Sequence, residues 1–202
     1  MLISSLEQIS NELVKVCFED GTEVKTTLGV VADMRLFTGK DLSCETLEAF
    51  KDASVKYLTL EKASEYLSRR QFSAKEMRDK LIQKGASADT ADFCVGKLLS
   101  LSLLDDERYA GAVARHYTSK GYGEGRIRAE FIRRGIPRDF WDGALASVSG
   151  SDDKIDSYIS RRLKNPGDRD EVRKLSASLY RRGFSWDEIK RAMARYTSED
   201  MD

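Results

Sequence analysis

The chain has 202 residues, 34% of them charged, and its 34 basic and 34 acidic side chains balance. Two prolines leave long stretches free to be helical. Its three cysteines, Cys17, Cys44 and Cys94, are odd in number and far apart, which excludes a disulfide framework and a metal-ligand spacing. The sequence lacks a signal-peptide pattern and an apolar run of the roughly twenty residues that cross a membrane. We therefore expect a cytoplasmic protein with no membrane partner.

The overall charge balance hides an asymmetry along the chain. The first sixty residues carry ten acidic and six basic side chains, whereas basic side chains outnumber acidic ones in the last fifty. Such polarity is typical of a protein with a charged partner.

The first elements predict a small mixed α/β extension over residues 1–57. Residues 1–10 are weakly amphipathic and predict a short helix. Leu13–Phe18 and Glu23–Thr27 are rich in Val and Thr and flank a turn that contains Gly21, a pattern that predicts a β-hairpin.

Two helices are expected to complete this extension. Apolar residues at helical spacing between Val30 and Phe37 predict a helix that stops at Gly39. A second helical stretch opens after Leu42-Ser43.

One short phrase recurs three times in the rest of the chain, as Met77–Gly85, Ile127–Gly135 and Leu175–Gly183. Each copy has an apolar residue, another four positions later, then a basic residue and a glycine. This is the second half of a helix with its stop signal, because glycine supplies the left-handed conformation that closes a helix. A period near fifty residues indicates repeats. We predict a mainly α fold of three tandem three-helix repeats in an elongated, curved array, at residues 58–104, 105–150 and 151–202.

Capping and core residues support this division. Ser73 with Glu76 and Ser185 with Glu188 form capping boxes at helix starts. Asp105 and Asp106 open the first helix of the second repeat, where acids favour the helix dipole. The remaining structural positions are the core residues and the turn or stop glycines: Leu67, Leu81, Leu104, Tyr109, Gly85, Gly123, Gly135 and Gly183.

Few residues suggest catalysis. His116 is the only histidine, and adjacent helical residues such as Asp105 and Asp106 do not face each other. The glycine-rich run 121–125 follows a predicted helix rather than a strand and lacks the Lys-Ser/Thr of a phosphate loop. We expect that the protein is not an enzyme and that it binds neither a cofactor nor a small-molecule ligand.

Basic residues recur at related places in the repeats. In one interpretation, basic side chains near the ends of helices interact favourably with the helix dipole and keep the surface solvated. The other reading is a basic stripe, lined up by stacked repeats, that meets a phosphate backbone or an acidic protein groove. The stripe comprises Arg69, Arg70, Lys80, Lys84, Arg126, Arg128, Arg133, Arg134, Arg181 and Arg182.

Several of these stretches resemble the RecX family of regulatory proteins over residues 58–196. The resemblance lies in Leu67-Ser68-Arg69-Arg70-Gln71-Phe72-Ser73, Glu76-Met77, Lys80-Leu81, Gly85, Leu103–Ala110, Gly121-Tyr122-Gly123, Arg126-Ile127, Phe131 and Gly135-Ile136. The chain departs from the family in two places. Gln71-Phe72 replaces a common Arg-Pro pair, and Ser102 replaces a common glycine, which argues against a left-handed turn at residue 102.

The resemblance implies a modulator of the RecA recombinase. RecX-like proteins bind in the helical groove of the RecA filament on single-stranded DNA, and typically restrain its growth, ATPase and strand exchange, thereby tuning DNA repair and the SOS response. By this resemblance the ten basic residues would contact the filament, with weak direct DNA contact. Asp105 and Asp106 would cap helices first and contact the recombinase second. Two other readings stay open: a direct DNA-binding protein of helix-turn-helix-like modules, and a helical scaffold for another protein.

Overall fold

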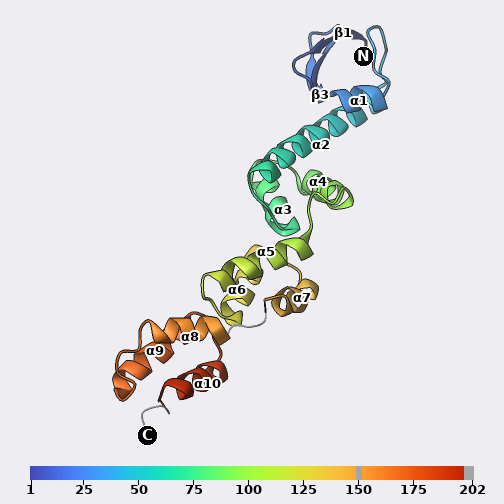
Figure 1. Cartoon of the computed structure of the whole chain (residues 1–202). Helices are drawn as coiled ribbons and strands as arrows, with labels where there is room; N and C mark the ends of the chain where they lie inside the picture. Colours follow the sequence, from blue (N-terminus) through green and yellow to red (C-terminus); the bar gives the residue numbers. More distant parts are fainter. Residues whose placement is uncertain (149–151, 198–202) are drawn as a thin grey trace. The chain divides into compact units, whose positions relative to one another are not determined.

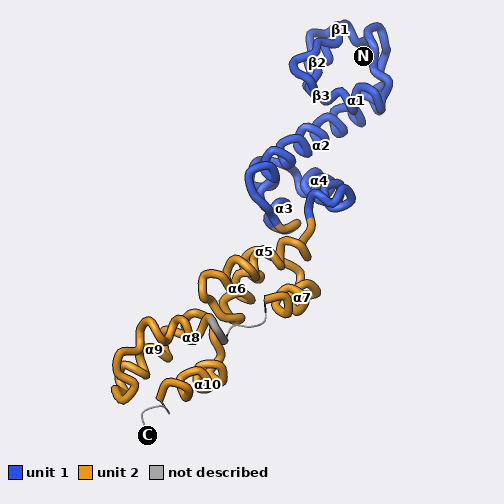
Figure 2. The backbone as a smooth tube through the Cα atoms, viewed as in Figure 1, with its two compact units in different colours: residues 1–72, 76–104 blue, residues 73–75, 105–202 orange. Residues whose placement is uncertain are grey.

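The structure, a computed structural model, describes residues 1–148 and 152–197. It is mainly helical, with a small sheet at the start of the chain (Figure 1). The chain forms two compact units (Figure 2). Unit 1 contains residues 1–72 and 76–104, and unit 2 contains residues 73–75 and 105–202.

Unit 1 begins with a three-stranded antiparallel sheet in the order β1-β2-β3. Its strands are β1 (Ile3–Gln8), β2 (Leu13–Phe18) and β3 (Glu23–Thr27), and β2–β3 is the predicted hairpin. The helix predicted over residues 1–10 is wrong, since most of that segment is β1. Pairing with β2 overrides its weak helical pattern. Lys15 of β2 bridges Glu7 of β1 at 2.8 Å and Glu23 of β3 at 3.2 Å.

Two helices follow the sheet. Helix α1 (Leu28–Asp33) ends earlier than predicted, because Arg35 adopts a positive φ of 49°. Helix α2 (Cys44–Arg69) begins at the Ser43 N-cap and is continuous through residues 57 and 58, where we placed a domain boundary. Its first half buries Phe50 against the sheet, and its second half buries Ala63 in the next core. One helix therefore serves both hydrophobic cores of unit 1.

The first repeat is completed by α3 (Ala74–Gln83) and α4 (Ala88–Ser100). Leu81 and Leu104 are buried in its core, and Leu67 is half-buried against it. Gly85 closes α3 at φ 95°, as the stop signal predicts. The expectation for Ser102 is wrong: this serine has a φ of 54°, so the chain makes the left-handed turn without glycine.

Unit 2 holds two further three-helix bundles, which confirms the predicted repeat architecture. The first bundle packs around Tyr109, Ile127, Phe131 and Trp141, and the second around Leu179 with its neighbours. The bundles comprise α5 (Asp106–Ser119), α6 (Glu124–Arg134), a 3₁₀ turn (Arg138–Phe140) and α7 (Trp141–Ala146), then α8 (Asp152–Ser160), α9 (Arg169–Arg181) and α10 (Trp186–Thr197). The repeat boundary predicted at residue 150 lies outside the described residues.

The structure shows which backbone groups the predicted capping residues at the starts of α5 and α10 bind. Asp105 caps α5 by accepting from the Arg108 N–H at 2.8 Å. At α10, Ser185 and Glu188 form the reciprocal capping box: the Glu188 N–H donates to the Ser185 hydroxyl at 3.2 Å, and the Ser185 N–H donates to the Glu188 carboxylate at 2.7 Å. Asp106 instead accepts from the backbone N–H of Ala74, the first residue of α3, at 2.9 Å.

None of the helices in the described ranges combines the length and apolar character that a membrane span requires. Across the same ranges, no group of His, Cys, Asp and Glu side chains is arranged to hold a metal ion.

Candidate partner-binding groove

Three glycines bring the second and third repeats into backbone contact inside unit 2. The Gly123 N–H donates to the Arg182 carbonyl at 3.0 Å, and the Gly125 N–H donates to the Gly183 carbonyl at 2.9 Å. A Cβ on Gly123 would lie 2.5 Å from the Gly183 oxygen, and one on Gly183 would lie 2.2 Å from the Arg126 nitrogen. We call these contacts the glycine joint. The sequence predicted Gly123 and Gly183 only as turn and stop residues.

Unit 2 contains a second contact of this kind, between residues 73–75 and the end of α6. The buried Ser73 hydroxyl donates to the Arg134 carbonyl at 2.5 Å. Gly135 closes α6 in the left-handed conformation, and a Cβ there would lie 2.1 Å from the Lys75 side chain. Close approach, as well as backbone conformation, therefore favours glycine at residue 135.

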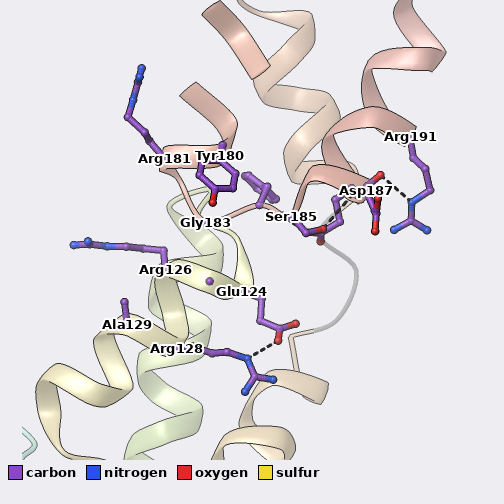
Figure 3. A pocket seen from close by; sticks show the side chains of 13 residues that line it. Glu124, Arg126, Arg128, Ala129, Tyr180, Arg181, Gly183, Ser185, Asp187 and Arg191 are labelled. Atoms are coloured by element: carbon purple, nitrogen blue, oxygen red, sulfur yellow. Dashed lines mark hydrogen bonds and ion pairs between the residues drawn. The ribbon is translucent and has the colours of Figure 1, made fainter. Parts of the chain in front are cut away.

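A groove of about 840 Å³ lies beside the glycine joint, between α6 and the turn that joins α9 to α10 (Figure 3). Its lining includes positively charged side chains, negatively charged side chains and two aromatic rings. They are Arg126, Arg128, Arg181 and Arg191, then Glu124, Asp187 and Glu188, then Tyr180 and Phe184.

The four arginines of the groove differ in how tightly they are held. Arg128 is paired with Glu124 at 2.6 Å, and this hydrogen bond raises the pKa of its guanidinium. Arg191 donates to the Asp187 carbonyl at 3.4 Å. Arg181 is exposed, forms no ion pair with a described carboxylate, and extends on the same side of the groove as Arg126 (Figure 3). Arg181 is therefore the groove arginine most available to a partner's carboxylate or phosphate.

Three arginines of the predicted stripe converge on one carboxylate of α6. Glu130 has a side chain only 4% exposed and lies 3.1 Å from Arg126, 2.7 Å from Arg133 and 3.6 Å from Arg134. Burial alone would raise the pKa of Glu130, but the hydrogen bond and charge of Arg133, with the charge of Arg126, hold it below its usual value. Arg134 also donates to the Tyr109 hydroxyl. These arginines stabilise α6 as well as presenting positive charge.

Arg182 contacts a different part of unit 2. Its guanidinium donates to the Gly121 carbonyl at 3.2 Å and lies 5.1 Å from the Tyr122 ring and 4.5 Å from the Tyr158 ring. The structure therefore gathers Arg126, Arg128 and Arg181 at the groove but leaves Arg182 out of it.

The other four predicted cations lie in unit 1. Arg70 stacks 3.5 Å from the centre of the Phe72 ring and pairs with Glu76 at 3.4 Å. Lys80 lies 5.6 Å from the Tyr66 ring. Arg69 and Lys84 are exposed. The stacking on Phe72 shows how the chain orders this turn with Gln71-Phe72 in place of an Arg-Pro pair.

The sequence offers Trp186 as either an interface anchor or a core residue but does not identify its partner Tyr180, which lines the groove. Tyr180 and Trp186 stack with ring centres 5.2 Å apart and planes 19° apart, although they are 54% and 49% exposed. Large aromatic side chains left accessible on a surface are typical binding anchors. The signal that could have revealed the pair is its apolar character at positions outside the core spacing of α9 and α10.

Family models match all three repeats. Those described as the first, second and third three-helix domains of RecX match residues 60–98, 105–145 and 160–193. The chain is 35% identical over 144 residues to the "Regulatory protein RecX" of Xanthomonas axonopodis pv. citri, covering 70% of this chain and 88% of that protein. It is 33% identical to the protein of the same name from Stenotrophomonas maltophilia, with the same coverage.

Two solved structures share the fold. "Crystal structure of regulatory protein RecX" aligns with a TM-score of 0.79 and 21% identity, over 98% of this chain and 99% of that one. "Crystal structure of RecX from Lactobacillus salivarius" aligns with a TM-score of 0.63 and 23% identity, over 73% of this chain and 99% of that one.

Proposed function

Because the chain belongs to the RecX family of regulatory proteins, we propose that it is a non-enzymatic regulator that binds the RecA filament on single-stranded DNA and restrains its activities. The restrained activities are ATP hydrolysis, strand exchange and the co-protease activity of the SOS response. The proposal places the protein in the cytoplasm, in DNA repair and recombination.

The mixed charge of the groove is the observation that supports a protein partner. Arg181 extends from one rim, and Glu124 and Asp187 lie on the other elements that line the groove. A surface with both charges and exposed aromatic rings suits another protein, on which charged groups of both signs are interspersed. A bare phosphate backbone would leave the carboxylates of the groove without favourable partners.

The charge pattern of α6 also favours a filament regulator over a helix-turn-helix DNA reader. Arg128 is paired with Glu124, and Arg126 and Arg133 are paired with Glu130, all on the same helix. A recognition helix presents polar side chains to base edges, whereas these arginines are engaged with carboxylates of their own helix. By the same proposal, Arg69, Arg70, Lys80 and Lys84 of unit 1 also contact the filament.

The test is DNA-dependent ATP hydrolysis by the cognate RecA on single-stranded DNA, with this protein added below stoichiometry. We expect the rate to fall while binding to naked DNA at the same salt stays weak. An unchanged rate without filament binding would refute the proposal and leave the scaffold reading. Tight, steeply salt-dependent binding to naked duplex would instead favour the DNA-binding reading.

A paired charge reversal tests the groove itself. Arg181→Glu with Arg191→Glu changes two cations of the groove, and we expect it to abolish inhibition with the helical circular dichroism intact. The matched control is Arg169→Glu with Lys174→Glu, which makes the same charge change at exposed positions of α9 outside the groove. Equal loss in both variants would show that net charge, and not the groove, carries the effect.

A further inference from the structure

A second hollow in unit 2 is rich in positive charge, since five of its nine described lining residues are cations. It has a volume of about 390 Å³ and lies where the end of α5, helix α8 with the turn after it, and the C-cap of α9 meet. No described carboxylate side chain lines it. Its cations are Lys120, Lys154, Arg161, Arg162 and Arg182.

Arg182 and Arg162 of this basic hollow contact a backbone carbonyl and an aromatic ring. Arg182 is fixed by the Gly121 carbonyl at 3.2 Å, and its guanidinium carbon lies 4.5 Å from the centre of the Tyr158 ring. Arg162 lies 4.6 Å from the same ring. Two guanidinium groups beside one tyrosine repel each other, and none of the five cations is ion-paired with a carboxylate whose side chain the structure describes. A bound anion would relieve this repulsion.

The Tyr158 side chain and the nearby Asp156 show the electrostatic environment of the hollow. Burial would raise the pKa of Tyr158, but its hydrogen bond with Ser178, 2.9 Å away, and the contacts and charge of Arg182 hold the phenol pKa below its usual value. Asp156 of α8 is paired with Arg195 of α10 at 2.7 Å.

From this geometry we propose that the basic hollow is a binding site for phosphate groups. Guanidinium groups match the oxygens of a phosphate with two parallel hydrogen bonds, and lysines add unshared charge. The Ser157 hydroxyl in the lining can donate a further hydrogen bond. The phosphate can be carried by a nucleic-acid strand or by a free di- or triphosphate. The site is separate from the groove, and its test needs no recombinase, so its failure and that of the proposed function are distinguishable.

The experiment compares two double variants of the full chain. Lys154→Ala with Arg161→Ala removes two exposed cations of the hollow, whereas Lys174→Ala with Arg169→Ala removes one exposed lysine and one exposed arginine outside it. Binding of a fluorescein-labelled oligo-dT is measured by anisotropy, and binding of pyrophosphate and ADP by calorimetry. Thermal unfolding checks that both variants fold. If the double variant of the hollow does not fold, the single variant Arg161→Ala replaces it in the binding measurements.

We expect the hollow variant to weaken binding by about tenfold or more, with a shallower salt dependence, and the control to weaken it by less than about twofold. Loss for oligo-dT alone would identify the source as a nucleic-acid strand. Loss for pyrophosphate or ADP alone would identify a free polyphosphate. Equal effects in both variants, or no binding of any of the three probes, would overturn the proposal.

Discussion

The backbone N–H of Gly125 donates to the carbonyl of Gly183 at 2.9 Å, so the start of the second helix in one repeat contacts the end of the second helix in the next. No side chain mediates this contact. The groove lies directly beside it and is lined by both glycines. The geometry of the groove therefore depends on how closely two backbones approach.

Replacing Gly123 tests that dependence, because its φ of −81° is accessible to any residue. We expect Gly123→Ala to lower the free energy of unfolding by about 1–3 kcal/mol, since its Cβ would lie 2.5 Å from the Gly183 oxygen. Denaturant unfolding measures the change. The control is Gly96→Ala, which has open space around it in α4 and should stabilise the protein by about 0.5–1 kcal/mol. Equal effects would show that the close approach costs nothing.

Glu130→Gln should destabilise the protein by about 1–3 kcal/mol at neutral pH, because it removes a charged acceptor shared by Arg126 and Arg133. The folded-state pKa of Glu130 is lowered, so its stabilisation is fully present above the unfolded pKa and is lost as the pH falls through the folded pKa. The difference between wild type and variant should thus be constant from about pH 6 to 8 and shrink below about pH 4.5. Unfolding followed across this range measures it. A difference that grows in acid would contradict the assignment.

Ser102→Gly should raise the free energy of unfolding by about 0.5–1 kcal/mol. Ser102 is exposed and held at φ 54°, where glycine avoids the steric cost that a Cβ imposes. Chemical denaturation provides the measurement. Ser100→Gly, in the last turn of α4 with ordinary helical geometry, is the matched control and should destabilise. Destabilisation by Ser102→Gly would mean that the left-handed turn is not strained.

The aromatic pair beside the groove should contribute to filament binding. We expect Trp186→Ala to weaken binding to the RecA filament by about tenfold or more, because an exposed aromatic anchor is lost, while thermal stability changes little. Val55→Ala removes a similarly exposed apolar side chain of α2 and should leave affinity unchanged. Filament pull-down at several protein concentrations gives both affinities. Unchanged affinity in Trp186→Ala would place the contact surface elsewhere.

A charge reversal at two residues of the predicted stripe, Arg133→Glu with Arg134→Glu, is a poor test of binding. Arg134 is half-buried and bonded to Tyr109, and both arginines contact Glu130. New carboxylates there would repel Glu130 and disturb α6. The exposed Arg181 gives a cleaner variant, because its side chain makes no ion pair with the described acids.

Local signals were sufficient for the ends of the second helix in each repeat and for the start of α10. The stop glycines Gly85, Gly135 and Gly183 and the Ser185–Glu188 capping box all depend on residues within one helix turn, and all appear in the structure as predicted. The first strand escaped prediction because β1 is stabilised by pairing with β2, which a local helical pattern does not reveal. The capping partner of Asp106 lies 32 positions away in sequence, so no local pattern could identify it.

The sequence by itself determined the three helical repeats and the kind of residue that presents charge, because apolar periodicity and capping act over a few neighbouring residues. Only the tertiary structure decided which cations act together. It placed Arg181 at a groove with carboxylates, and Arg182, its neighbour, in a hollow whose described lining contains none. Adjacent residues at a helix end diverge in direction, and their electrostatic environment depends on which distant side chains the fold brings within a few ångströms.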